Sequence, residues 1–106
     1  MAVERLSRQE AVDLVRHCLE HGSVIQSGHF RKELFDEGVE FDDALLVLRS
    51  GQIYDEPEHD IRKGEWKYRM EGYEPGGKWL VIVFSFKAED ERFLITVFSV
   101  QSRRRP

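Results

Sequence analysis

The sequence predicts an α+β fold, in which N-terminal helices pack on one face of a C-terminal antiparallel sheet of three to four strands. Apolar residues recur at helical spacing within residues 7–51, whereas they alternate with polar residues within residues 52–101. Laying the helices across the apolar face of the sheet gives a two-layer sandwich whose other face is open to solvent. The chain has 106 residues, of which 41% are hydrophobic, so we expect one domain over residues 1–106, ending in a basic tail at 102–106.

The first helix is predicted over residues 7–21. Ser7 and Glu10 have the S-x-x-E spacing in which each side chain caps the backbone amide of the other residue. Gly22 follows at the position where a left-handed residue commonly ends a helix. The apolar stripe that would face the sheet consists of Ala11, Val12, Leu14, Val15, Cys18 and Leu19.

Two more helices are predicted after a brief extended link at residues 24–25. Ser27 is expected to cap the second helix and Asp42 or Asp43 the third, because short polar side chains accept hydrogen bonds from first-turn amides. A glycine is expected to end each helix, Gly38 the second and Gly51 the third. Their expected buried residues are Phe30, Leu34 and Phe35 in the second helix and Ala44, Leu45, Val47 and Leu48 in the third.

The second half of the chain is typical of antiparallel strands joined by turns. One strand alternates apolar with charged residues, in the order Trp66, Lys67, Tyr68, Arg69, Met70 and Glu71. The central strand is apolar on both faces, at residues 80–84, and the last strand covers residues 93–98. The connecting segments are a short edge strand at 52–54, an irregular mobile loop at 55–64, and turns at 74–77 and 88–91.

Composition excludes several classes of protein. Cys18 is the only cysteine, so no intramolecular disulfide framework is available, as expected in a reducing compartment. The N-terminus lacks the apolar stretch of a signal peptide, and the longest apolar run, at residues 79–84, is too short to cross a bilayer. We therefore expect a cytoplasmic protein with no membrane partner and no cofactor.

Three short patterns could carry chemistry, but each has a simpler structural interpretation. His17, Glu20 and His21 match the H-x-x-E-H order of some zinc hydrolases, yet the helix ends directly afterwards. Cys18 lies on the apolar stripe, which favours a buried core residue over a reactive thiolate. Acidic residues surround His59 without the spacing of a calcium loop, which favours a solvated acidic segment: Asp55, Glu56, Glu58 and Asp60. We predict no metal site.

A cationic segment at residues 62–69 differs from the rest of the chain. It has a local net charge of +3, whereas the whole chain has a net charge of −4 and a pI near 5.6. Strand alternation would place Lys67 and Arg69 side by side on the open sheet face, where they could bind phosphate oxygens. The other cations expected around this surface are Arg62, Lys63, Lys78 and Lys87.

Two further interpretations concern the neighbours of these cations. Lys67 and Arg69 could instead form cross-strand salt bridges with Glu71 and Glu74 on a solvated sheet face. Tyr54 and Tyr73 could stack on nucleic acid bases, although aromatic residues in strands more often belong to the core.

Several motifs in the middle and end of the chain suggest a family. The most specific is residues 64–72, GEWKYRMEG. The others are residues 27–30 (SGHF), 38–41 (GVEF), 47–53 (VLRSGQI), Gly77 and 94–97 (LITV). Over about residues 27–100 the chain resembles an uncharacterised bacterial and archaeal domain-of-unknown-function family, itself similar to RelE-like and MqsR-like toxins.

The resemblance implies a toxin of a toxin–antitoxin system that cleaves messenger RNA without a metal and is neutralised by a cognate antitoxin protein. Lys67 and Arg69 would then bind phosphate and stabilise the transition state, with His29 or His59 as proton donor. The acidic net charge favours a second interpretation. The chain would then be a non-catalytic protein-interaction module that presents the same face to an acidic protein or to a second copy of itself. Oligomeric state does not follow from the sequence.

Overall fold

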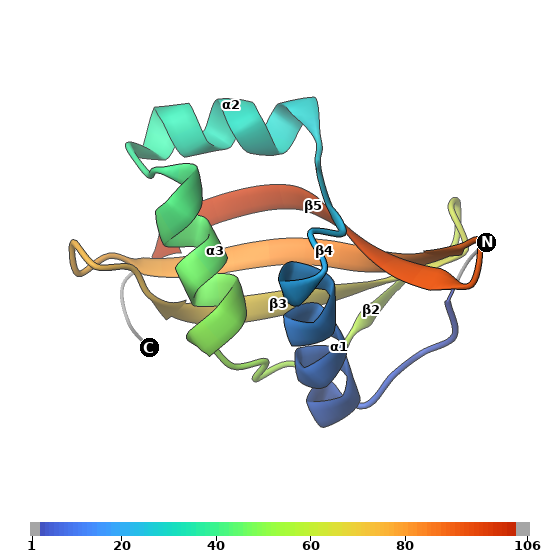
Figure 1. Cartoon of the computed structure of the whole chain (residues 1–106). Helices are drawn as coiled ribbons and strands as arrows, with labels where there is room; N and C mark the ends of the chain where they lie inside the picture. The colour runs from blue at the N-terminus through green and yellow to red at the C-terminus, as the bar shows by residue number, and fades with distance from the viewer. Residues whose placement is uncertain (1–2, 104–106) are drawn as a thin grey trace.

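The computed structural model describes residues 3–103 as three helices and a five-stranded sheet (Figure 1). In chain order the elements are α1 (Arg8–Glu20), β1 (Val24–Gln26), α2 (Gly28–Glu37), α3 (Phe41–Ser50), β2 (Glu58–Asp60), β3 (Glu65–Tyr73), β4 (Trp79–Glu89) and β5 (Arg92–Arg103). The predicted α+β class is confirmed. Within the described range no helix is both long and apolar enough to cross a membrane.

The sheet has the strand order β1-β5-β4-β3-β2, so the apolar strand β4 is central, as predicted. All neighbouring strands are antiparallel except β1 and β5, which pair in parallel from Val24↔Ile95 to Gln26↔Val97. The predicted antiparallel sheet is confirmed for β2 to β5, but the sheet has five strands rather than three to four, because β1 adds a parallel edge strand. Strand β1 was predicted only as an extended link, because three residues are too few to show a two-residue period.

The predicted helix starts at Ser7 and Ser27 are confirmed. Ser7 Oγ accepts a hydrogen bond from the amide of Glu10, whose carboxylate accepts one from the amide of Ser7. Ser27 Oγ accepts from the amide of Phe30, and Gly38 ends α2 in the left-handed region. The prediction for α3 is wrong: its N-cap is Glu40, without a side-chain cap, and the aspartates at 42 and 43 lie in its first turn.

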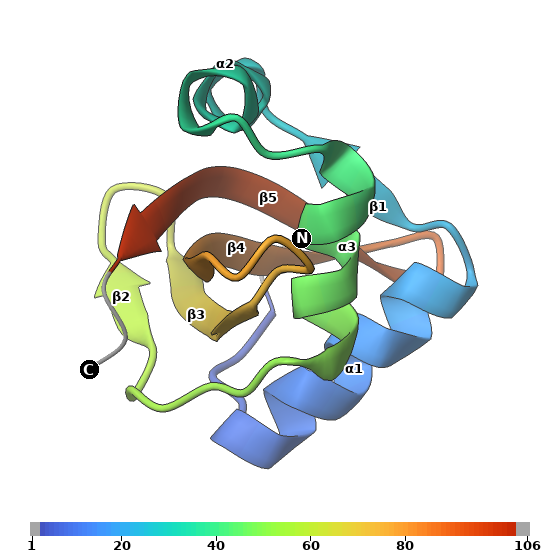
Figure 2. The ribbon, with the colours of Figure 1, turned by 90° about the vertical axis from the view of Figure 1, so that its left-hand side faces the viewer.

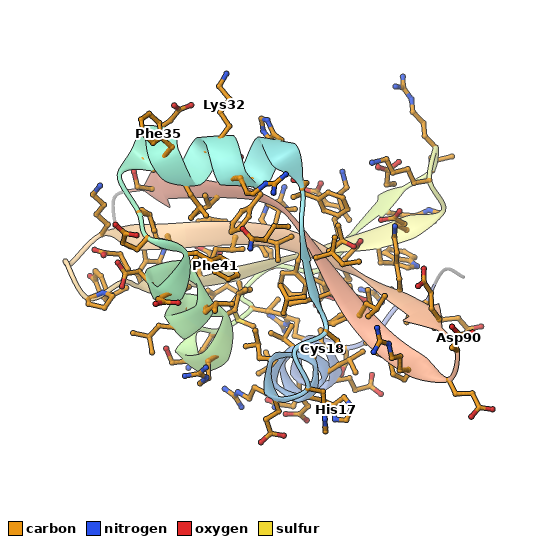
Figure 3. All side chains as sticks on the ribbon, turned by 45° about the horizontal axis from the view of Figure 1, so that its top comes forward. His17, Cys18, Lys32, Phe35, Phe41 and Asp90 are labelled. Carbon is orange, nitrogen blue, oxygen red and sulfur yellow. The ribbon has the colours of Figure 1, made fainter. Side chains whose placement is uncertain are left out.

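Helices α1 and α3 cover one face of the sheet, and α2 lies along the edge of β5 (Figures 1 and 2). Phe30 and Leu34 of α2 are buried as predicted, but Phe35 is 86% exposed and points away from the sheet (Figure 3). Residues 30 and 34 share one face of a helix, whereas residue 35 lies about 100° further round. Since α2 covers an edge, only one narrow face of it can be buried.

The position of α2 is fixed by polar contacts with β5. Beyond the end of β1, the amide of Val100 donates to Glu33 Oε1 at 3.3 Å, and the hydroxyl of Ser102 donates to Glu37. The hydroxyl of Ser27 donates to the carbonyl of Phe98 at 3.1 Å. Helix α2 thus satisfies backbone groups of β5 that no strand pairs with, and it protects this edge from other chains.

The boundaries of several predicted segments change in the structure. Residues 52–54 form no strand; Gln52 makes one isolated bridge with Glu71. The edge strand is instead β2, inside the stretch predicted as an irregular loop at residues 55–64. Two residues of the predicted basic tail, Ser102 and Arg103, belong to β5, and the rest of that tail lies outside the described residues.

The sheet face opposite α1 and α3 is concave, and we refer to it as the concave face. Lys63 follows β2, yet its Nζ lies 5.2 Å from the ring of Phe98 in β5, although β3 and β4 separate these strands. This contact requires the sheet to curl so that β2 turns toward β5 (Figure 2). The prediction of a fully solvated face is wrong, because Val81 and Ser85 on this face are buried.

A glycine is needed at position 51 because the backbone there lies very close to the backbone of β3. A left-handed conformation is not the reason. The φ of Gly51, −76°, is open to any residue, but a Cβ there would lie 2.6 Å from both the Val47 and the Glu71 carbonyl oxygens.

We expect Gly51→Ala to lower the free energy of unfolding by about 1–3 kcal/mol, as overpacking does. Urea denaturation measures this. Gly28→Ala is the control, because its Cβ meets nothing within 4 Å; an equal loss in both variants would contradict the explanation.

Candidate functional site

The candidate site is built on the β2–β3 hairpin, whose turn is shaped by Asp60. The Asp60 carboxylate oxygen Oδ1 accepts hydrogen bonds from the amides of Arg62, at 3.1 Å, and Lys63, at 3.2 Å. The amide of Gly64, which has a φ of +64°, donates to the carbonyl of Asp60 at 2.8 Å. An aspartate that accepts from amides two and three residues ahead is a common way to hold a tight turn.

Both predicted anion-binding cations are ion-paired with acids of β2. Arg69 Nη1 lies 2.7 Å from Glu58 Oε1, and Lys67 Nζ lies 3.3 Å from Asp60 Oδ2. The salt-bridge interpretation is thus confirmed in kind. Its predicted partners, however, are wrong.

The acids predicted as partners, Glu71 and Glu74, are used elsewhere. Glu71 Oε1 accepts a hydrogen bond from Trp79 Nε1 at 3.1 Å. Glu74 Oε1 accepts from the amide of Lys78 at 2.7 Å and thereby closes the β3–β4 turn. No local pattern indicates the true partners, because β2 pairs with β3 only in the folded hairpin.

These contacts favour the charged forms of the β2 acids. The hydrogen bond from Arg69, followed by its positive charge, lowers the pKa of Glu58. The amide of Lys63 and then the side chain of Lys67 lower the pKa of Asp60, against an opposing effect of desolvation. At neutral pH both acids therefore neutralise the cations next to them.

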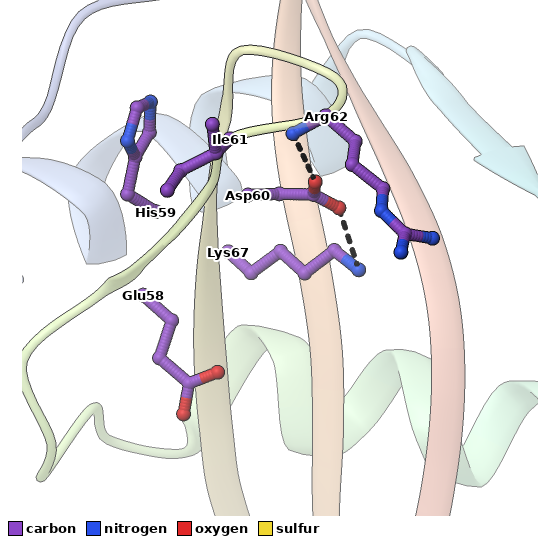
Figure 4. Close-up of a pocket in the computed structure, with 6 residues that line it drawn as sticks. All are labelled: Glu58, His59, Asp60, Ile61, Arg62 and Lys67. Carbon is purple, nitrogen blue, oxygen red and sulfur yellow. Dashed lines mark hydrogen bonds and ion pairs between the residues drawn. The ribbon is translucent and has the colours of Figure 1, made fainter.

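A surface pocket of about 390 Å³ lies at this hairpin (Figure 4). It is lined by Glu58, His59, Asp60, Ile61, Arg62 and Lys67. On the concave face, Lys63 and Lys67 hold their ammonium groups 5.2 and 5.1 Å from the ring of Phe98. The structure therefore brings four of the predicted cations, Arg62, Lys63, Lys67 and Arg69, to this hairpin, together with the two carboxylates of Glu58 and Asp60.

Neither predicted proton donor shares this face with the cations. His59 lines the pocket, but it pairs with Trp66 across the hairpin and its ring stacks on the Trp66 ring at 4.5 Å, so the imidazole is directed to the opposite side of the hairpin from Lys67. His29 is on α2, with its Nε2 3.1 Å from Glu33 Oε1. Strand alternation explains the position of His59, because successive residues of β2 point to opposite faces.

The other two predicted cations do not join the cluster either. Lys78 donates a hydrogen bond to the carbonyl of Glu37 at the end of α2. Lys87 is half-buried on β4, opposite Leu94. Lys78 and Lys87 lie near opposite ends of β4, so the length of the strand separates them.

An aromatic cluster, Tyr54, Tyr73 and Trp79, occupies the other end of the concave face. The Trp79 ring centroid lies 5.0 Å from that of Tyr73 and 6.2 Å from that of Tyr54. Tyr54 is 50% exposed and Tyr73 47% exposed, whereas Trp79 is buried beneath them. Sequence reasoning singled out both tyrosines and missed Trp79, although pairing across the 74–77 turn would have placed it opposite Tyr73.

The remaining sequence patterns carry no site. Cys18 is fully buried, and burial raises the pKa of its thiol to about 11, so it is a core residue as predicted. The rings of His17 and His21 lie 4.4 Å apart at the exposed end of α1. Among residues 3–103, no three His, Cys, Asp or Glu side chains are placed to hold a metal ion.

A family model described as "Domain of unknown function (DUF4258)" matches residues 26–99. This range agrees closely with the extent of the resemblance found in the sequence. No curated protein matches the chain.

The Glu58–Arg69 ion pair predicts a pH dependence. Because the pKa of Glu58 is lowered in the fold, its charged form stabilises the protein above the unfolded-state pKa. This contribution is lost as the pH falls through the folded-state pKa. We expect Glu58→Gln to lower the urea midpoint at pH 7 and to match the wild type once the pH is below both pKa values. Glu4→Gln, at an exposed position, is the control; the same pH-dependent loss there would contradict the assignment.

Proposed function

Since the chain belongs to the DUF4258 family, a domain of unknown function, we propose its role from its own surface: it is a non-catalytic module that binds a protein partner. The partner docks on the aromatic cluster at the end of the concave face. The observation that carries this proposal is the pair of half-exposed tyrosines held against a buried tryptophan.

The chemistry of the cluster suits a protein interface. Tyrosine and tryptophan are enriched at protein interfaces, where they bury a large area at a small cost in side-chain entropy. Trp79 is held by its hydrogen bond to Glu71, and Tyr73 lies edge-on to its ring. The rings are therefore already ordered before a partner arrives, which lowers the entropic cost of binding.

Electrostatics favours a protein over a polyanion. Lys67 and Arg69 each have a carboxylate beside them, so these two cations offer little uncompensated positive charge. The chain also has a net charge of −4. Nucleic acid binding draws most of its affinity from neutralised phosphates, and this surface would gain little from that source.

The toxin and endoribonuclease functions remain predictions. Their proposed transition-state cations are neutralised, and neither histidine lies on the face where a proton donor is needed. A cognate antitoxin is itself a protein, so an antitoxin would be one partner that fits the proposed docking surface.

A site-specific cross-linking experiment tests the proposal. With benzoylphenylalanine at position 54, we expect one partner protein to be captured in the source cell; position 35, on the exposed side of α2, should not capture it. After both proteins are purified, Tyr73→Ala should weaken binding by roughly tenfold or more, as substitutions at interface hot spots do. Phe35→Ala should have no effect. Calorimetry measures both affinities, and circular dichroism checks that each variant is folded.

Three outcomes would contradict the proposal. The partner could bind Tyr73→Ala as tightly as wild type, or the cross-links at positions 54 and 35 could be the same. Cross-linking of position 54 to a second copy of the chain, together with a dimer in sedimentation, would replace the separate partner with self-association.

The endoribonuclease prediction has its own test. If the module is non-catalytic, purified protein leaves messenger RNA intact in the presence of a chelator, and its expression does not arrest growth. Cleavage by the wild type that is lost in both Lys67→Ala and Arg69→Ala, with Lys32→Ala as an exposed control on α2, would instead establish the nuclease.

A further inference from the structure

A second pocket, of about 220 Å³, lies between α1 and the segment that leaves α3. Its lining contains two arginines and no acidic residue: Arg8, Gln9, Val12, Arg16, Gly51, Gln52 and Ile53. Arg8, Val12 and Arg16 are spaced by four residues and so share one face of α1. Val12 is buried and forms an apolar floor between the two guanidinium groups.

Both arginines are anchored to the chain on either side of the pocket. Arg16 Nε donates to the carbonyl of Arg49 at 3.0 Å, on the N-terminal side of the lining residues 51–53. Arg8 Nη1 donates to the carbonyl of Tyr54 at 2.7 Å, on the C-terminal side of the same residues. The two guanidinium groups therefore bracket this segment, and a bond to a neutral backbone carbonyl fixes Arg16 without cancelling its charge.

Acidic side chains reach this region only at its edges. Glu56 Oε1 lies 3.5 Å from Arg8 Nε, and this carboxylate is shared with Arg5, at 2.6 Å. Asp13 accepts a hydrogen bond from Gln9 Nε2 at 2.9 Å. Arg16 has no acidic partner among residues 3–103, and its bond to Arg49 uses Nε alone. Its two terminal nitrogens are thus available to a ligand.

We propose that this pocket binds a phosphate group. A guanidinium group presents a fork of donors that matches phosphate oxygens, so the two terminal nitrogens of Arg16 can bind the anion, while Arg8 adds a second positive charge to the lining. The Cα atoms of Arg8 and Arg16 are about 12 Å apart along the helix axis at 1.5 Å per residue, so the two arginines lie toward opposite ends of the pocket. The volume is below the roughly 300–1,000 Å³ of drug-sized ligands, so it fits one anionic group and not a whole cofactor.

This inference does not depend on the proposed protein-binding role. The pocket lies on α1 and the segment after α3, whereas the aromatic cluster lies on the concave face. Either site can therefore fail its test without affecting the other.

NMR titration of the ¹⁵N-labelled protein with inorganic phosphate at constant ionic strength tests the site. We expect saturable shifts of the Arg8 and Arg16 Nε–H signals, and none with acetate at the same concentration. Arg16→Gln should weaken phosphate binding by roughly tenfold, because a hydrogen bond between charged groups is lost. Arg16→Lys should weaken it as well, since a point charge lacks the fork. Arg31→Gln, on α2, removes the same charge elsewhere and should not.

A second titration, with an RNA oligonucleotide carrying or lacking a 5′-phosphate, identifies the source of the phosphate. Shifts with free phosphate alone indicate a small-molecule ligand, and shifts with both free phosphate and 5′-phosphorylated RNA indicate a terminal phosphate. Absence of saturable shifts with every phosphate probe would overturn the proposal. So would equal weakening by Arg16→Gln and Arg31→Gln, which would show only a general effect of charge.

Discussion

The long antiparallel ladder between β4 and β5 is the constraint on which the rest of the structure depends. It runs from Trp79↔Arg103 to Glu89↔Arg92 and supplies the apolar surface that the helices need. Burial of each large apolar side chain on it contributes about 1.5–3 kcal/mol. Seven of its residues are almost fully buried in the core: Leu80, Ile82, Phe84, Phe86, Ile95, Val97 and Val100. Without this ladder, α1 and α3 would have no common surface to cover.

One irregularity in the ladder links the core to the concave face. The register shifts between Val83 and Phe84, so that Phe98 is an extra residue in β5. Such a bulge increases the local twist of a sheet, which is consistent with the curl that brings the β2–β3 hairpin toward β5. Phe98 then provides the ring over which the ammonium groups of Lys63 and Lys67 lie. The helix cap Ser27 also satisfies the carbonyl of Phe98, so α2 and the bulge stabilise each other.

Charge is distributed unevenly between the two candidate surfaces. On the concave face, β2 contributes acids that neutralise the cations of β3, leaving the aromatic cluster as its most distinctive feature. Beside α1, both arginines are held by backbone carbonyls; Arg8 also pairs with Glu56, whereas the charge of Arg16 is not cancelled by an acid among residues 3–103. The two surfaces meet at Tyr54, whose ring belongs to the cluster and whose carbonyl accepts from Arg8.

Local sequence patterns were sufficient to locate two helix starts, one helix end and the central strand of this protein. Ser7, Ser27 and Gly38 act through neighbours a few residues away, and the apolar run of β4 reports burial on both faces, so pattern alone located them. Tertiary structure decided which acids pair with Lys67 and Arg69, which face holds His59, and that Trp79 joins Tyr54 and Tyr73. These contacts depend on a three-residue edge strand and on the curl of the sheet. Such features arise from interactions between distant segments, and a two-residue or 3.6-residue period carries no information about them.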